Sequence, residues 1–277
     1  MLWMLGSGFC FVAVIAIVRR LEGSLPAAES SFIRYIIGLV FFIPYVFKLS
    51  VNNFKSEIFF KYVTRAIFHA LAVVFWFYAM SKLPIAEVTA IGYMTPVFVT
   101  LGAVIFFRET ISYWRISAIC IAFSGVILIL RPGFEVWSIG QVSQVLATIF
   151  FAGSYLIVKD LTRTESSTAI VGMMTLLVTI ALAPMAAYVW VTPSLNELIS
   201  LFFVALFATA GHFFMTKALS IAPVVVVQPV TFLQLVWATL LGIFVFDEAL
   251  DLFVLFGGTI ILVSVTFISY RETVKKR

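Results

Sequence analysis

Residues 78–112 read YAMSKLPIAEVTAIGYMTPVFVTLGAVIFFRETIS, and residues 217–251 read KALSIAPVVVVQPVTFLQLVWATLLGIFVFDEALD. The two stretches align without a gap at an offset of 139. The identities least expected by chance in an apolar sequence are Ser81/Ser220, Pro84/Pro223 and Glu109/Glu248. The chain is therefore predicted to consist of two related halves, 1–131 and 132–277.

The composition of the whole chain indicates a membrane protein. Of its 277 residues, 63% are apolar and 11% are charged, whereas a soluble domain averages about half apolar and roughly a quarter charged. Composition therefore excludes a soluble enzyme, a nucleic-acid-binding module and a disordered chain, and it makes the lipid bilayer a partner. The net charge of +5 implies no nucleic acid, because membrane proteins concentrate Lys and Arg in their cytoplasmic loops.

Hydropathy divides the chain into ten apolar segments, each close to the ~20 residues that a spanning helix needs. The connections between them are short, so no soluble domain is expected between spans. The first segment lacks a charged n-region and a small-residue cleavage pattern, so it is expected to be a retained helix. We predict an all-α, polytopic (multi-pass) membrane protein with transmembrane helices at 2–18, 28–47, 62–80, 85–106, 112–130, 137–158, 167–190, 198–216, 223–245 and 252–270.

Basic residues predict the orientation of these spans. With a cytoplasmic N-terminus, the outer segments hold four of the 18 Lys and Arg residues, namely Arg19, Arg20, Lys82 and Arg131. Arg34 falls within a span, and the remaining 13 lie in cytoplasmic segments. This excess predicts that both termini face the cytoplasm across the inner (plasma) membrane. The pair Arg19 and Arg20 is the one local exception.

An odd number of spans in each half inverts the second half relative to the first. Five-helix halves place Glu109 at the cytoplasmic face and its counterpart Glu248 at the outer face. Upstream of the aligned stretches the repeat continues at an offset of 140, with Phe11 opposite Phe151. Inverted repeats are typical of secondary transporters, in which two similar halves expose a central site to each side in turn. The repeat therefore predicts a permease that transports its substrate by this mechanism.

One sequence pattern occurs once in each half: A-[ML]-[SI]-x-x-P, then an apolar helix, then F-x-E. Together with SFIRY at 31–35 and PVTFLQLVWATLLG at 229–242, it resembles the EamA branch of the drug/metabolite transporter superfamily over essentially the whole chain. The resemblance implies ten helices around a central cavity, walled mainly by the third, fourth, eighth and ninth. Members carry amino acids, S-adenosylmethionine, riboflavin, toxic compounds and other metabolites, so the resemblance implies a small-molecule substrate without identifying it.

Ionisable side chains inside the spans are candidates for substrate or proton binding, because charges within a bilayer are costly. Glu87 is either a solvated carboxylate near Lys82 at the outer rim or a site for a substrate amine or a proton. Arg34 reaches the interface, braces neighbouring helices or binds an anionic substrate group. His212 is either a structural histidine or a cavity-lining residue and the second proton-coupling candidate. His69 is expected at the membrane interface.

Four prolines are candidates for helix breaks or gating ends. Pro96 and Pro229 lie inside the fourth and ninth spans, where each frees a backbone carbonyl four residues back. Interrupted helices of this kind often line the binding sites of transporters. Pro84 and Pro223 lie at the starts of the same two spans, and we expect them at the gating ends.

Polar and aromatic side chains complete the expected cavity. Two glutamines in one apolar helix are expected to line the cavity or to contact another helix. Four aromatic side chains either cage a flat or cationic ligand or pack in the core. These cavity candidates are Trp76, Tyr93, Tyr155, Gln228, Gln234 and Trp237. In the fifth span, Ala118, Ala122 and Gly125 are expected to allow close helix approach.

Motifs for several other activities are absent from the sequence. It has no G-x-x-x-x-G-K-[ST] phosphate loop and no H-E-x-x-H motif, so we expect neither ATP hydrolysis through that loop nor a metal or other cofactor. We therefore favour a carrier of a small amphipathic metabolite that works by alternating access. A non-transporting scaffold or receptor is the alternative, and an intramembrane enzyme has less support. The substrate, the direction of transport and the formation of a homodimer stay open.

Overall fold

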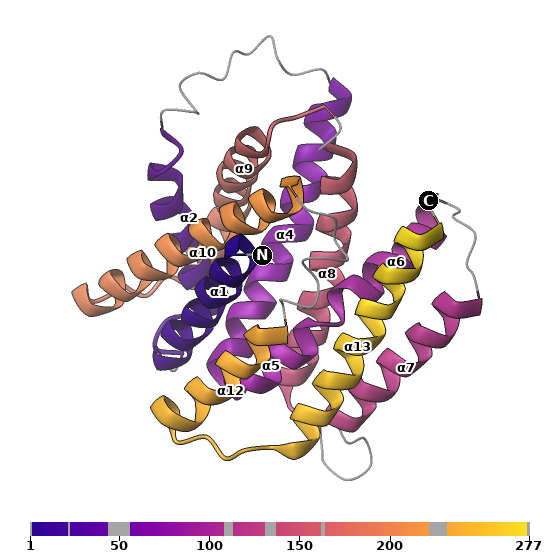
Figure 1. Cartoon of the computed structure of the whole chain (residues 1–277). Coiled ribbons are helices and arrows are strands. Elements are labelled where there is room, and N and C mark those ends of the chain that lie inside the picture. The colour runs from indigo at the N-terminus through magenta and orange to yellow at the C-terminus, as the bar shows by residue number, and fades with distance from the viewer. Residues whose placement is uncertain are drawn as a thin grey trace.

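The computed structural model describes residues 2–21, 23–43, 56–107, 113–130, 137–161, 164–221 and 232–275. In this part of the chain all regular structure is helical (Figure 1). The helices are α1 (Leu2–Arg20), α2 (Ala27–Val40), α4 (Ser56–Lys82), α5 (Ile85–Gly92), α6 (Thr95–Phe107), α7 (Tyr113–Leu130), α8 (Ile139–Leu161), α9 (Ser167–Tyr188), α10 (Leu195–Ile221), α12 (Phe232–Phe246) and α13 (Leu252–Lys275).

These helices overlap the ten segments predicted from the sequence. Helices α5 and α6 are the two halves of the fourth span, and each of the other described helices belongs to one span. Within the described residues, five helices are long and apolar enough to cross a membrane individually, and the other apolar helices are shorter. Each of the ten predicted segments overlaps at least one described helix, and the prediction of an all-α, multi-pass protein is confirmed.

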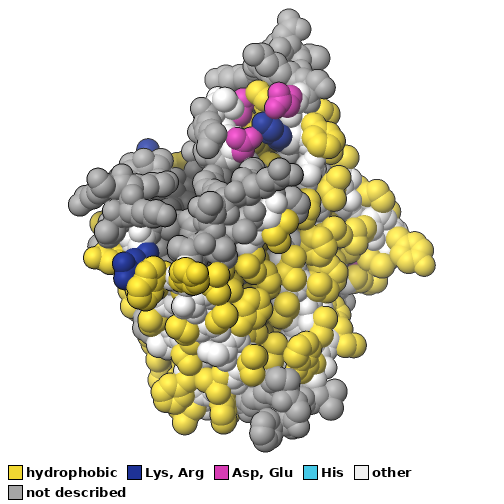
Figure 2. All heavy atoms as spheres, turned by 90° about the vertical axis from the view of Figure 1, so that its right-hand side faces the viewer, with side chains coloured by type: hydrophobic (Ala, Val, Ile, Leu, Met, Phe, Trp, Pro, Cys, Tyr) yellow, Lys and Arg dark blue, Asp and Glu magenta, His cyan; other side chains and the backbone are white. Residues whose placement is uncertain are grey.

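The surface of the bundle suits a lipid environment. Large apolar side chains are exposed along the helices, among them Phe9, Ile121, Ile180, Phe244 and Phe256. Figure 2 shows hydrophobic side chains over most of the described surface on one side, with the acidic side chains of that view gathered near its upper end. An apolar surface of this extent is the expected boundary with hydrocarbon chains.

Short polar motifs at helix starts satisfy backbone N–H groups that have no partner within their helix. Before α10, the Ser194 N–H donates to Glu197 Oε2 at 2.7 Å and the Glu197 N–H donates to Ser194 Oγ at 3.4 Å. This reciprocal pair is a capping box. Ser138 and Gln141 form the equivalent pair at the start of α8, at 3.0 and 3.1 Å. The sequence thus determines locally where these two helices begin.

Helix packing follows the sequence repeat, which relates α1 to α8 and α4 to α10. In the structure α1 packs mainly on α10, and α8 packs mainly on α4. The repeat relation therefore converts one of these helix pairs into the other. Helix α2 packs on α9 and α7 packs on α13, and each of these pairs joins a helix to its own counterpart. A pseudo-twofold relation between inverted halves requires this pattern. The two halves are therefore interleaved and share one interior.

The contact between α7 and α13 depends on two glycines. A Cβ atom added to Gly125 would lie 2.6 Å from the Gly257 carbonyl oxygen, and one added to Gly257 would lie 2.5 Å from the Gly125 carbonyl oxygen. Real Cβ atoms do not approach oxygen so closely, so the crossing requires glycine, which has no Cβ, at both positions. The expected close approach of the fifth span is confirmed, and Ala118 and Ala122 are buried beside it.

The apolar core has two main parts. The larger lies among α1, α2, α4, α9 and α10, and it includes Ile15, Tyr35 and Leu201. The second lies chiefly among α5, α7 and α13, and it includes Ile91 and Ile261. Buried ionisable side chains lie next to the larger part, where the two halves meet.

Candidate functional site

Four ionisable side chains lie buried near the middle of the bundle. Arg34 comes from α2, Arg65 and His69 come from α4, and His212 comes from α10, with exposed fractions of 5%, 6%, 2% and 9% in that order. We call these four residues the central polar cluster. Because α2 and α4 belong to the first half and α10 belongs to the second, both halves contribute to it.

A small cavity adjoins the central polar cluster. Residues of α2, α9 and α10 line it: Arg34, Tyr35, Gly38, Val171, Met174, Thr175, Thr209 and His212. The space open to the centre of a water-sized sphere is about 10 Å³, which is room for roughly one water molecule. A whole metabolite does not fit into this volume.

Arg34 lies against an aromatic ring and not against a carboxylate. Its Cζ atom is 3.9 Å from the centroid of the Tyr35 ring, which is the geometry of a cation–π contact. The ion pairs of the described residues include neither Arg34 nor Arg65. The burial of Arg34 does not fit a side chain that reaches the membrane interface. Bracing of neighbouring helices and ligand binding are the roles that fit the geometry.

The two histidines of the chain come from different halves and pack against each other. The ring centroids of His69 and His212 are 5.8 Å apart. His69 Nδ1 lies 3.3 Å from Ser154 Oγ of α8, while its buried Nε2 has no hydrogen-bond partner among the described residues. The prediction of an interfacial His69 is wrong, because α4 begins at Ser56 and extends to Lys82, which puts residue 69 at its midpoint.

Aromatic rings surround the histidine pair, and two of these rings are repeat counterparts although the histidines are not. Phe11 of α1 packs edge-on against His212 at a centroid distance of 5.1 Å. Its repeat counterpart, Phe151 of α8, packs edge-on against His69 at 5.2 Å. Trp76 contacts both phenylalanine rings, at 6.3 and 5.9 Å. We call Phe11, Trp76 and Phe151 the aromatic wall, and it lies beside the two histidines of the central polar cluster.

The structure separates the four aromatic cavity candidates. Trp76 and Tyr155 both lie beside Phe151, at centroid distances of 5.9 and 6.5 Å. Tyr93 follows the end of α5. Trp237 is 45% exposed and lines, with Phe9, an apolar groove of about 270 Å³ between α1 and α12. Trp76 and Tyr155 therefore lie near the central polar cluster, and Trp237 lies on the outside of the bundle.

The fourth span is interrupted next to its proline. Helix α5 ends at Gly92 and α6 begins at Thr95. Pro96, the second residue of α6, has no N–H with which to continue the hydrogen-bond ladder of α5. Gln144 of α8 donates its Nε2 to the Val88 carbonyl oxygen of α5 at 3.0 Å. A polar side chain of the second half therefore supports the interrupted helix of the first.

The remaining helix-break and glutamine candidates have less described structure around them. Pro84 is the N-cap residue of α5. Gln234 is partly buried on α12, and its Cβ atom lies 3.6 Å from the place where a Cβ on Gly8 of α1 would be. The other three predicted residues, Pro223, Gln228 and Pro229, lie outside the described residues.

Glu87 lies in the first turn of α5 and is 9% exposed. Gln141, at the start of α8, donates its Nε2 to Glu87 Oε1 at 2.7 Å. This carboxylate is buried and accepts its hydrogen bond from an amide of the other half. Glu87 therefore lies at a contact between the halves, nearer to the end of the bundle than the central polar cluster is.

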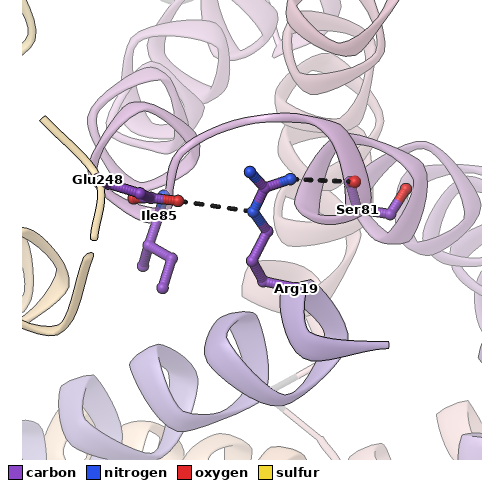
Figure 3. Close-up of polar contacts among 4 residues, drawn as sticks. All are labelled: Arg19, Ser81, Ile85 and Glu248. Atoms are coloured by element: carbon purple, nitrogen blue, oxygen red, sulfur yellow. Dashed lines mark hydrogen bonds and ion pairs between the residues drawn. The ribbon is translucent and has the colours of Figure 1, made fainter. Parts of the chain in front are cut away.

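A second polar group lies where α1 and α4 end and α5 begins (Figure 3). Arg19 Nε is 3.5 Å from Glu248 Oε1, and Arg19 Nη1 donates to the Ser81 carbonyl oxygen at 3.2 Å. Glu248 Oε2 accepts the N–H of Ile85 at 3.0 Å. We call Arg19, Ser81, Ile85 and Glu248 the end cluster. It ties α1 and the α4–α5 connection of the first half to the segment that follows α12 in the second.

Arg19, one of the two residues that form the local exception in the distribution of basic residues, is paired with Glu248 and with a backbone carbonyl. Glu109, the repeat counterpart of Glu248, lies outside the described residues.

Two buried charged residues were not predicted from the sequence. Arg65 is one of the 13 basic residues that the charge count places in cytoplasmic segments. In the structure its Nη1 donates to the Ile170 carbonyl oxygen at 2.8 Å and its Nη2 lies 3.1 Å from Met174 Sδ, both in the interior. Its spacing of four residues from His69 is a usable signal, because residues four apart share one helix face. Glu29, in the first turn of α2, is fully buried and accepts the Val191 N–H at 2.9 Å. No sequence pattern pairs those two positions.

The chemistry available at these sites is charge and hydrogen bonding. In the described ranges, no three His, Cys, Asp or Glu side chains come together as a metal site would require. The central polar cluster instead offers two guanidinium groups and two imidazole rings beside an aromatic wall. Such an arrangement suits recognition of a polar ligand with a flat or apolar part.

Comparisons with known proteins agree with this architecture. A family model described as the EamA-like transporter family matches residues 1–131 and 138–270. The S-adenosylmethionine uptake transporter of Rickettsia bellii (strain RML369-C) is 28% identical over 254 residues, which cover 92% of this chain and 87% of that protein. The riboflavin transporter of Vibrio cholerae serotype O1 is 27% identical over 281 residues, which cover 100% and 94%. One crystal structure of a protein aligns with 98% of this chain and 96% of its own, with a TM-score of 0.67 and 13% identity, and supports the fold alone.

Proposed function

The chain belongs to the EamA-like transporter family, and from this premise we propose that it is a secondary carrier that moves a small amphipathic metabolite across the inner membrane by alternating access. Transport of a metabolite is what the named relatives have in common. The protein is a multi-pass membrane protein, and we propose residues 1–131 and 132–277 as its two inverted repeats. Two such repeats are the usual basis of alternating access.

The strongest support for a carrier is the central polar cluster. Ionisable groups inside a bilayer are costly and are typical of substrate or ion pathways. Arg34 of the first half and His212 of the second line one cavity, so a movement of one half against the other would change access to it. A scaffold gains nothing from buried charges of this kind, because apolar packing would hold its helices together at lower cost.

We propose the end cluster as the closed outer gate. With both termini in the cytoplasm, the end of α1 and the start of α5 face outward. Opening this end would break the ion pair between Arg19 and Glu248 and the hydrogen bond from Ile85, a small set of contacts that substrate binding can offset. The gating ends and hinges of this proposal are Pro84, Pro96, Pro223 and Pro229.

The named relatives supply the first substrates to test, S-adenosylmethionine and riboflavin. Glu87 and His212 are the proposed proton-coupling residues if transport uses a proton gradient. Exchange of one metabolite for another, or flow down the metabolite's own gradient, would need neither. The pH dependence of transport distinguishes these energy sources.

Uptake into liposomes tests the proposed function. The purified protein is reconstituted, and uptake of radiolabelled S-adenosylmethionine, riboflavin, amino acids, nucleosides and organic cations is compared with that of protein-free liposomes. Saturable uptake of at least one compound, inhibited by the same compound unlabelled, is the expected result. Folded protein that takes up none of them would contradict the carrier and favour the scaffold.

A further inference from the structure

The geometry points to a recognition site for a carboxylate group of the substrate, formed by Arg34 and the cavity that it shares with His212. Such a site rests on the proposed function and narrows it to organic acids and zwitterions that bear a carboxylate. The relatives do not decide the matter, because S-adenosylmethionine carries a carboxylate and riboflavin does not.

The centre of the bundle holds positive charge without matching negative charge. Arg34 and Arg65 are both buried, and no carboxylate of the described residues lies within 4.0 Å of either guanidinium. The two buried carboxylates in helices of the first half, Glu29 and Glu87, lie in the first turns of α2 and α5. They accept hydrogen bonds there from other partners.

An anion at this position would balance a charge that the described residues leave unbalanced. A buried charge without a partner is costly, and an arginine stays charged at any ordinary pH. Arg65 does not line the cavity, and its Nη1 donates to the Ile170 carbonyl oxygen at 2.8 Å. A bound anion therefore supplies the missing negative charge at Arg34.

The position of Arg34 favours an anion with two oxygens in one plane. The Arg34 Cζ atom lies 3.9 Å from the centroid of the Tyr35 ring, and a guanidinium carries its N–H donors in one planar fork. A carboxylate accepts two parallel N–H bonds from such a fork. Thr209 and His212 line the same cavity from α10, so its second wall is also polar.

The rest of the substrate would meet aromatic rings. Phe11 packs against His212 at 5.1 Å, and Trp76 follows at 6.3 Å from Phe11. The cavity itself admits only a group of about the size of a water molecule. A carboxylate is larger than a water molecule, so the cavity at Arg34 would have to widen to hold it. The larger part of the substrate would lie along the aromatic wall once the halves separate.

Matched ligand pairs test the site through the melting temperature of the detergent-purified protein. The pairs are S-adenosylmethionine with its decarboxylated form and tryptophan with tryptamine, and each pair differs in the carboxylate. We expect the acid of at least one pair to bind the wild type about tenfold or more tightly than its partner, as a charge-assisted hydrogen-bonded pair allows. Arg34→Gln should remove this difference. If both members of each pair stabilise the wild type equally, the site is overturned.

Arg271→Gln is the matched control. Arg271 also lies over an aromatic ring, with its Cζ 4.6 Å from the Trp114 centroid, but on the exposed surface of α13. We expect it to respond to the ligand pairs as the wild type does. A purely structural Arg34 would appear as a lower melting temperature of Arg34→Gln without ligand and an unchanged response to the acids. That outcome also overturns the site.

A second arm needs no identified substrate. The melting temperature is measured in sodium acetate and in sodium chloride at equal ionic strength. Acetate should stabilise the wild type more than chloride does, and Arg34→Gln should abolish the difference. Equal effects of the two salts on the wild type would show an adventitious anion response and overturn the carboxylate site.

Liposome uptake separates this site from the proposed function. Saturable uptake that is indifferent to the carboxylate and unchanged in Arg34→Gln would overturn the site and leave the carrier intact. A specific acetate response through Arg34, together with no uptake of any compound, would support the site and contradict the carrier.

Discussion

Glu248 accepts the backbone N–H of Ile85 at 3.0 Å, although the two residues belong to different halves of the chain. Ile85 is the first residue of α5, so a carboxylate of the second half caps a helix of the first. The same carboxylate lies 3.5 Å from Arg19 Nε. The halves are thus tied together at one end of the bundle, away from the central polar cluster.

Removal of this carboxylate should destabilise the protein. Glu248→Ala leaves the Ile85 N–H without its acceptor and Arg19 without its ion-pair partner, and we expect a loss of about 1–3 kcal/mol in the free energy of unfolding. Glu248→Gln keeps an amide oxygen for Ile85 and should lose less. Denaturation of both variants in the same detergent provides the comparison. Equal losses would contradict a capping role for Glu248.

The crossing of α7 and α13 should not tolerate a methyl group. Gly257→Ala places a Cβ 2.5 Å from the Gly125 carbonyl oxygen, so the helices must separate, at a cost of about 1–3 kcal/mol. Gly8→Ala is the control, because its Cβ would lie 3.6 Å from Gln234 Cβ in ordinary contact. Melting temperatures in detergent test the difference. A drop of similar size in both variants would argue against a special requirement at Gly257.

Two tryptophans should differ in their effect on transport. Trp76 lies in the aromatic wall beside the histidines, whereas Trp237 is 45% exposed on the outside of the bundle. We expect Trp76→Leu to weaken the apparent affinity for substrate about two- to tenfold, the range of one aromatic contact, and Trp237→Leu to leave it unchanged. The substrate concentration at half-maximal uptake measures both. A larger effect at Trp237 would place the binding site elsewhere.

Replacement of Glu87 should change the pH dependence of uptake if a proton drives transport. Acid outside the liposomes should accelerate uptake by the wild type, and Glu87→Gln should not respond, because an amide cannot take up the proton. Gln141 would still find an oxygen acceptor at position 87, so the contact at 2.7 Å should survive. A variant with the pH profile of the wild type would exclude Glu87 as the proton site and leave His212.

Reporter fusions test the orientation. Fused after Arg277, green fluorescent protein should fluoresce and alkaline phosphatase should be inactive, because the excess of basic residues predicts a cytoplasmic C-terminus. Active phosphatase at the C-terminus would show that the orientation is opposite to the predicted one and that the end cluster lies on the cytoplasmic side.

The sequence by itself determined that the protein has ten spans in two related halves. In lipid, each span must satisfy its own backbone hydrogen bonds, so about 20 apolar residues in a row are enough to identify a helix. The repeated serine, proline and glutamate positions identified the halves because polar identities are rare in an apolar chain. Pro96 marked the place where the fourth span separates into α5 and α6.

Only the tertiary structure decided which side chains meet. The hydrocarbon around the bundle is as apolar as its core, so the pattern of apolar residues does not tell which face of a helix points inward. For this reason the sequence treated Trp76 and Trp237 alike, and the structure separates them. The sequence also predicted His69 at the interface, because the depth of a residue in the membrane depends on where its helix begins, and the sequence does not fix that residue closely. Helix packing brings His69 within 5.8 Å of His212 and beside two arginines that no carboxylate of the described residues balances.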